Sequence, residues 1–165
     1  MLGLRVLLVL CTLLVPEGRP TSCFGQQSSR RTEIYNDSFV AAAHLELKPF
    51  VGKYKPTLLS RQKIANSYEP AQCDYLLTYQ VGTGKFIFYQ TPDKALIQSF
   101  TSSTPLVVLA KGVKVGMSQA AFEQVFHQKI AGTIATVGDT ETFQVYTFTF
   151  RKHTLAQIDY ECRID

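Results

Sequence analysis

The C-terminal part of the chain carries the pattern that most constrains its fold, a strict alternation of aromatic and polar residues. In the segment 143–150, Tyr146, Phe148 and Phe150 fall on one face of a strand. Residues 151–153 then supply a turn into a returning strand. Alternation with one polar face is typical of an antiparallel sheet that is covered on one side only. In the returning strand the predicted inner residues are Ala156, Ile158, Tyr160 and Cys162, and the outer residues are Gln157, Asp159 and Glu161.

The middle of the chain predicts further strands and one clear helix. Two β-rich runs, 75–79 and 86–89, flank a glycine-containing turn, which indicates a hairpin. A third strand is expected over 95–100, and the apolar segment 106–109 is expected to pair at a sheet edge. We expect the stretch 130–139 to be a loop.

Ser118 predicts the start of the helix, because its side chain can accept a hydrogen bond from the first helical turn. Phe122, Val125 and Phe126 then form one apolar helical face. A shorter helix over 38–47, capped by Ser38, is also expected. The fold class is therefore α+β, with a mainly antiparallel sheet covered on one face by one or two short helices.

The run Gly82-Thr83-Gly84-Lys85 contains the residue types of a phosphate-binding loop but not their spacing. A Walker loop needs four residues between its first glycine and its Gly-Lys-Ser/Thr, and a helix afterwards. Here one residue separates the glycines, and a strand is expected next. The run predicts a turn.

The run 112–118 (Gly-Val-Lys-Val-Gly-Met-Ser), the helix after it and the terminal aromatic hairpin form a recognisable combination. Over residues 111–162 it resembles the helix-plus-sheet module of small outer-membrane assembly lipoproteins and β-lactamase-inhibitory-protein-like domains. The whole chain is also similar to uncharacterised exported proteins of Bacteroidetes-type bacteria. This resemblance implies a non-enzymatic envelope protein that binds another protein or helps to assemble one.

The N-terminal residues are typical of a secretory leader. Arg5 precedes the apolar run 6–15, which is about half the roughly 20 residues that a membrane-spanning helix needs. We expect a signal peptide over 1–22, a flexible tail over 23–37 and a single α+β domain over 38–165. The expected location is extracytoplasmic, in the periplasm or cell envelope or secreted.

The cysteines follow from that location. Cleavage after Ser22 would place Cys23 at the new N-terminus, where a bacterial lipoprotein carries its lipid; the alternative is a soluble secreted protein with a disordered N-terminal stretch. Membrane contact is expected only with a lipidated Cys23. Cys73 and Cys162 are the candidate disulfide pair, because an oxidising compartment permits the bond. Two buried free thiols are the alternative.

Catalytic and metal motifs are missing from the sequence. It has no CxxC, HxxxH, HExxH or Gly-x-Ser-x-Gly spacing, so no metal, cofactor or catalytic residue is predicted. The net charge of +4 is too mild for a nucleic-acid partner. A basic cluster between 48 and 63 is interpreted as a solvated face, with an anionic-ligand site as the alternative; its members are Lys48, Lys53, Lys55, Arg61 and Lys63.

The expected function is non-enzymatic binding of an unknown protein partner through the sheet face or loops. One alternative is a small secreted hydrolase with a site assembled from distant residues and His127 or His153 as base; His44 is the third histidine. The other alternative is a lipid or small ligand held between sheet and helix.

Overall fold

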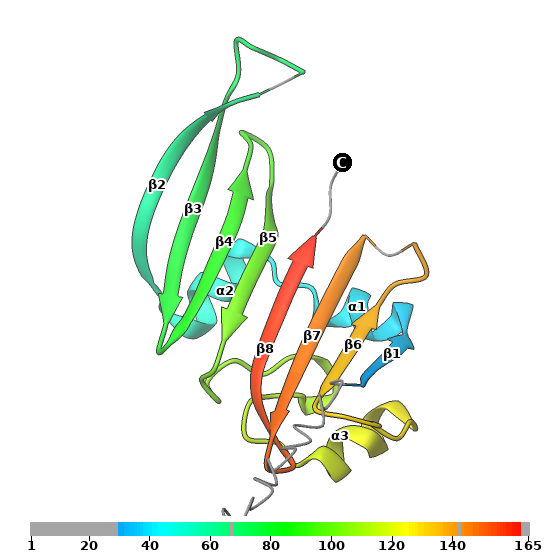
Figure 1. The fold of residues 1–165 in the computed structure, drawn as a ribbon. Helices are drawn as coiled ribbons and strands as arrows, with labels where there is room; N and C mark the ends of the chain where they lie inside the picture. The colour runs from blue at the N-terminus through cyan, green and yellow to red at the C-terminus, as the bar shows by residue number, and fades with distance from the viewer. Residues whose placement is uncertain (1–29, 67, 142, 163–165) are drawn as a thin grey trace, which may run out of the picture.

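A single eight-stranded sheet forms the body of the computed structural model, which describes residues 30–66, 68–141 and 143–162 (Figure 1). The strand order is β1-β6-β7-β8-β5-β4-β3-β2. Only the β1–β6 pair is parallel among the described strands, so the prediction of a mainly antiparallel α+β fold is confirmed. The strands are β1 Arg31–Tyr35, β2 Thr57–Ala65, β3 Cys73–Val81, β4 Gly84–Gln90, β5 Ala95–Ser102, β6 Ile134–Gly138, β7 Gln144–Arg151 and β8 Thr154–Cys162.

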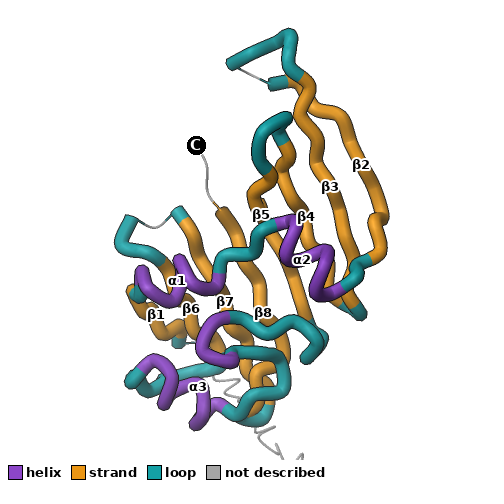
Figure 2. The backbone as a smooth tube through the Cα atoms, turned by 180° about the vertical axis from the view of Figure 1, so that it is seen from behind, coloured by secondary structure: helices purple, strands orange, loops and turns teal. Residues whose placement is uncertain are grey.

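Three short helices pack on one face of the sheet, each through a buried phenylalanine. They are α1 Asp37–Ala43, α2 Leu47–Tyr54 and α3 Gln119–Phe126 (Figure 2). The ring centroid of Phe39 in α1 lies 5.6 Å from that of Tyr146. Phe50 in α2 lies 4.8 Å from Phe86, and Phe122 in α3 lies 4.8 Å from Phe148. Rings therefore fill the space between helix and sheet at these three points.

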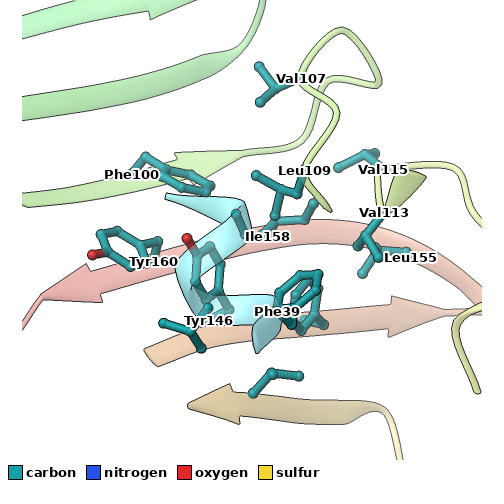
Figure 3. Packing of buried hydrophobic residues seen from close by; sticks show 14 of the residues in the cluster. Phe39, Phe100, Val107, Leu109, Val113, Val115, Tyr146, Leu155, Ile158 and Tyr160 are labelled. Carbon is teal, nitrogen blue, oxygen red and sulfur yellow. The ribbon is translucent and has the colours of Figure 1, made fainter. Parts of the chain in front are cut away.

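On that same face, one row of apolar side chains crosses all eight strands. Its centre is a chain of ring contacts, which begins with Phe86–Phe100 at 5.1 Å between centroids. It continues with Phe100–Tyr160 at 5.6 Å and Tyr146–Tyr160 at 4.7 Å, and these three rings are labelled in Figure 3. Aromatic pairs at such distances stabilise a core beyond their area burial alone. From β2 to β1, the cross-strand partners in the row are Leu58, Tyr79, Phe86, Phe100, Tyr160, Tyr146, Val137 and Ile34.

The connection between β5 and α3 extends this core without forming a strand. Val107, Leu109, Val113 and Val115 are buried along it, and a 3-10 turn occupies Ala110–Gly112. The prediction that 106–109 pairs at a sheet edge is therefore wrong. The segment is apolar because alternate side chains point into the core from a loop.

Two strands, β1 and β6, lie where the sequence predicted a tail and a loop. β1 falls inside the expected tail 23–37, and β6 inside the expected loop 130–139, so both expectations are wrong for these residues. Both strands are short. Their close approach depends on Gly132, where an added Cβ would lie 2.0 Å from the carbonyl oxygen of Arg30.

The first helical segment also differs from the prediction. Asn36, not Ser38, caps α1: its Oδ1 accepts a hydrogen bond from the Phe39 amide at 2.9 Å. A separate helix, α2, follows despite Pro49. Proline is tolerated there because it stands in the first turn, where amides have no helical acceptor.

The terminal hairpin is confirmed, with one change of face. Lys152 and His153 have φ values of 48° and 59°, which suits a two-residue turn. The pairing then shifts between Thr149 and Phe150. Because such an irregularity moves side chains from one face to the other, Leu155 is buried where Ala156 was predicted.

Ser118 caps α3 as predicted, accepting from the Ala121 amide at 3.2 Å. One turn later, Glu123 ties the helix to the chain beyond it. Its carboxylate accepts from the Ile130 amide at 2.9 Å, from Lys129 Nζ at 3.0 Å and from Gln119 Nε2 at 3.2 Å. These hydrogen bonds lower the pKa of Glu123 to about 2, and the bond from the Ile130 amide has the largest effect.

Two core tyrosines differ in hydroxyl bonding and give a matched test. The Tyr146 hydroxyl is buried and has no hydrogen-bond partner among the described residues, whereas Tyr160 donates to Gln144 Oε1 at 3.1 Å. Tyr146→Phe should leave the free energy of unfolding unchanged or raise it, because it removes an unsatisfied polar group. Tyr160→Phe should lower it by about 1 kcal/mol. Urea unfolding measures both, and a larger loss in Tyr146→Phe would contradict the assignment.

The carboxylate network at Glu123 predicts an acid-dependent stability. A folded-state pKa below the unfolded one means that ionised Glu123 stabilises the fold above its ordinary pKa. That contribution should be lost as the pH falls from about 4.3 towards 2. The stability gap between wild type and Glu123→Gln, measured by denaturant unfolding, should therefore shrink over this range. Glu141→Gln, at an exposed side chain, is the control and should show no such gap.

Candidate binding surface on the open face of the sheet

The face opposite the helices carries a second row, which is polar in all eight strands. Residues alternate between faces along a strand, so this row lies one residue away from the aromatic row. The pairing registers place its members side by side across the sheet. From β2 to β1 they are Thr57, Gln80, Lys85, Thr101, Asp159, Thr147, Thr136 and Glu33.

A depression of about 550 Å³ lies over the middle of this row. Lys85 of β4 and Arg31 of β1 bring positive charge to it, and β8 contributes carboxylates. The remaining polar lining is hydroxyl. Its polar residues are Arg31, Lys85, Ser99, Thr101, Thr136, Thr147, Asp159 and Glu161, beside the apolar side chains of Ile87 and Val145.

Asp159 is the best-bonded group of the depression. Its Oδ1 accepts a hydrogen bond from Thr101 Oγ1 at 2.7 Å, and Gln157 Nε2 donates to both carboxylate oxygens at 3.0 and 2.9 Å. The carboxylate is thereby fixed between two neighbouring strands. Hydroxyls, a carboxylate and peripheral cations offer donors and acceptors of either kind, which suits a polar partner.

The histidines of the hydrolase alternative lie elsewhere and apart. His127 caps the C-terminal end of α3, whereas the carbonyl of His153 accepts from the Gln119 amide at the N-terminal end. An eight-residue helix separates such ends by roughly 12 Å. His44 is the C-cap of α1. In the described part of the chain, none of the three imidazoles makes a hydrogen bond or ion pair, so the structure does not bring them together into a site.

The predicted disulfide between Cys73 and Cys162 is wrong in this fold. Cys73 begins β3 and Cys162 ends β8, and two strands, β5 and β4, lie between them. Three strand spacings amount to roughly 14 Å, well beyond the reach of a disulfide. Both are free cysteines: Cys73 interacts with Lys63, and burial raises the pKa of the Cys162 thiol. Cys23 lies outside the described residues.

A second polar cluster, at the far end of the β2–β3 hairpin, was not predicted. Asp74 is fully buried and accepts from Asn66 Nδ2 at 2.8 Å, from Gln72 Nε2 at 3.0 Å and from the Tyr89 hydroxyl. These hydrogen bonds lower the pKa of Asp74, and the bond from the Tyr89 hydroxyl has the largest effect. Asn66 Oδ1 in turn accepts from the amides of residues 68 and 69. The sequence places Asp74 at the start of an apolar run, but its hydrogen-bond partners come from three segments.

Within residues 30–66, 68–141 and 143–162, no group of three or more His, Cys, Asp or Glu side chains could hold a metal ion. The helices of these ranges include none long and apolar enough to cross a bilayer. Comparisons with protein-family models, curated proteins and solved structures find no match. The resemblance of residues 111–162 to envelope lipoprotein modules therefore stays a prediction.

The separation of the cysteines predicts indifference to reductant. A Cys73–Cys162 bridge would close a loop of roughly 90 residues, worth about 4–5 kcal/mol in the chain-entropy model, and its reduction would lower the melting temperature by many degrees. We expect that reductant does not change the melting temperature of the wild type. The matched control is the Cys162→Ser variant, which cannot form the bridge and should respond to reductant as the wild type does. Thermal unfolding of wild type with and without reductant measures this. A large drop in the wild type alone would contradict the separation.

Proposed function

We propose that the protein is a non-enzymatic, extracytoplasmic module that binds a protein partner through the open face of its sheet. The polar row across all eight strands carries this proposal. A sheet face without a covering layer usually points to solvent or to a partner. On this face the row is polar throughout, and charge of both signs borders the central depression.

The shape of the surface supports a large partner rather than a small substrate. Small-molecule sites enclose most of their ligand and are predominantly apolar. The depression here is hydroxyl-rich, and it spreads over six strands. Its mixed polar and apolar lining is typical of non-obligate protein interfaces.

In this proposal the helices and the loop 103–118 cover one face of the sheet. The opposite, open face is then the one that binds the partner. The extracytoplasmic part rests on the leader-like sequence of residues 1–22, and the envelope role rests on the resemblance of residues 111–162. No histidine lines the depression. The hydrolase alternative therefore has no general base of that type at this surface.

The proposal is tested by partner capture from an envelope extract of the native host. Wild type should retain one partner in stoichiometric amount. Thr101→Arg combined with Thr147→Arg places two bulky cations on the open face and should reduce retention at least tenfold. Gln124→Arg, on the exposed side of α3, is the control and should retain the partner as wild type does.

Two results would refute the proposal. Equal retention by the open-face variant and wild type would exclude the open face as the binding surface. Recovery of unprocessed chain from the cytosol of the native host would exclude the extracytoplasmic role. Both variants should first be shown to unfold at the wild-type temperature, so that a loss of retention reports on the surface.

A further inference from the structure

The excess positive charge of this protein is concentrated in one continuous segment. Residues 47–68 contain the five cations of the basic cluster and no Asp or Glu. Since the whole chain carries +4, the rest of it carries −1. The segment forms α2 and β2, so the fold gathers this charge along one side of the molecule.

Among the residues that the structure describes, none of these five cations forms an ion pair. In the described ranges the ion pair between Lys129 and Glu123 is the only one, and it belongs to the end of α3. Arg61 instead lies over the ring of Tyr75, 3.9 Å from its centroid. Lys63 lies beside the Cys73 thiol. Arg61 and Lys63 therefore lie beside neutral neighbours and remain available to an anionic partner.

β2 is also an edge strand. It is last in the strand order, next to β3 alone (Figure 1). Its nine residues span roughly 30 Å, and eight of them are exposed. An edge strand presents a row of backbone N–H and C=O groups that can pair with another strand.

The pairing register shows which face of β2 carries the charge. Arg61 is opposite Leu77 and Lys63 is opposite Tyr75, so both side chains project on the face that also carries the helices. Two residues apart, they would face alternate residues of any strand added at this edge. The other face of β2 offers Gln62 and the partly buried Ile64.

The edge is held in an extended conformation before any partner binds. The hydrogen bond from Asn66 Nδ2 to the Asp74 carboxylate joins the distal ends of β2 and β3. At the near end, the amide of the C-cap residue Lys55 donates a hydrogen bond to the Val51 carbonyl of α2. A strand fixed at both ends loses little conformational entropy on pairing, which favours binding.

We propose that β2 binds an extended, acidic segment of a protein partner by adding it to the sheet as a ninth strand. Backbone hydrogen bonds to β2 would hold the segment, and carboxylates at alternate positions would face Arg61 and Lys63. Strand addition of this kind takes affinity from the backbone and specificity from alternate side chains. This inference rests on the proposed function as a protein-binding module and names the partner's chemistry.

A second copy of this chain does not fit the same edge. The only charged residues of β2 are Arg61 and Lys63, so any pairing of β2 with itself brings together cations alone. Like charges on directly opposite residues destabilise a strand pair. The two cations thus act against self-association and in favour of an acidic strand.

The test uses the full chain and a capped nine-residue peptide in which Glu alternates with Val. Fluorescence anisotropy measures binding, and amide chemical shifts locate it. Wild type should bind with shifts concentrated in residues 57–65. Arg61→Glu combined with Lys63→Glu should weaken binding at least tenfold. Lys111→Glu combined with Lys114→Glu makes the same change of charge at exposed residues outside the segment and should alter affinity less than twofold.

Modified peptides separate strand addition from simple charge attraction. One peptide is N-methylated at every Val and another at every Glu. In an added strand only one of these two sets points its amides at β2. One modified peptide should therefore lose binding while the other keeps it, and a peptide with Lys in place of Glu should not bind.

Four outcomes would overturn the inference: equal binding of both N-methylated peptides, binding of the Lys peptide, shifts centred outside β2, or binding of phosphatidylglycerol vesicles without binding of the peptide. The partner-capture experiment keeps the two proposals apart. A captured partner that binds the Arg61→Glu/Lys63→Glu variant as it binds wild type would refute the edge site and leave the proposed function standing.

Discussion

Burial of one aromatic row is the interaction on which the rest of this structure depends. The row runs from Leu58 to Ile34 through all eight strands. Its central rings, from Phe86 to Tyr146, each contact the ring on the neighbouring strand. Each helix adds a phenylalanine to it or beside it. An edge strand such as β1 is short, yet it is held because Ile34 ends this row. A sheet whose apolar side chains share one face must leave the other face to polar residues.

The division into two faces also separates stability from binding. The polar row and the depression above it can change without opening the core, because their side chains point away from it. The cations of β2 do not follow this division of polar and apolar side chains between the two faces. Arg61 and Lys63 lie on the helix side of the sheet, beyond the rings that α2 contacts. Charge thereby gathers at an edge where backbone groups are also open to pairing.

Sequence reasoning succeeded where the pattern was local. The alternation around Phe148 and the capping serine of α3 each depend on neighbours within a few residues, and both are confirmed. It failed where partners are distant. β1 is a strand because β6, about one hundred residues later, pairs with it, and Leu155 is buried because the register shifts. Cys73 and Cys162 were paired on chemistry alone, while the strand order keeps them apart.

The sequence alone determined that this chain makes a mainly antiparallel sheet with one apolar face, because alternation with period two allows little else. It also determined that the basic residues cluster between 48 and 63. Only the tertiary structure decided that Thr101, Asp159, Thr147 and Thr136 stand in one row and that the basic segment forms the edge of the sheet. Strand order and register arise from contacts between residues far apart in the chain, and such contacts leave no periodic trace in the sequence.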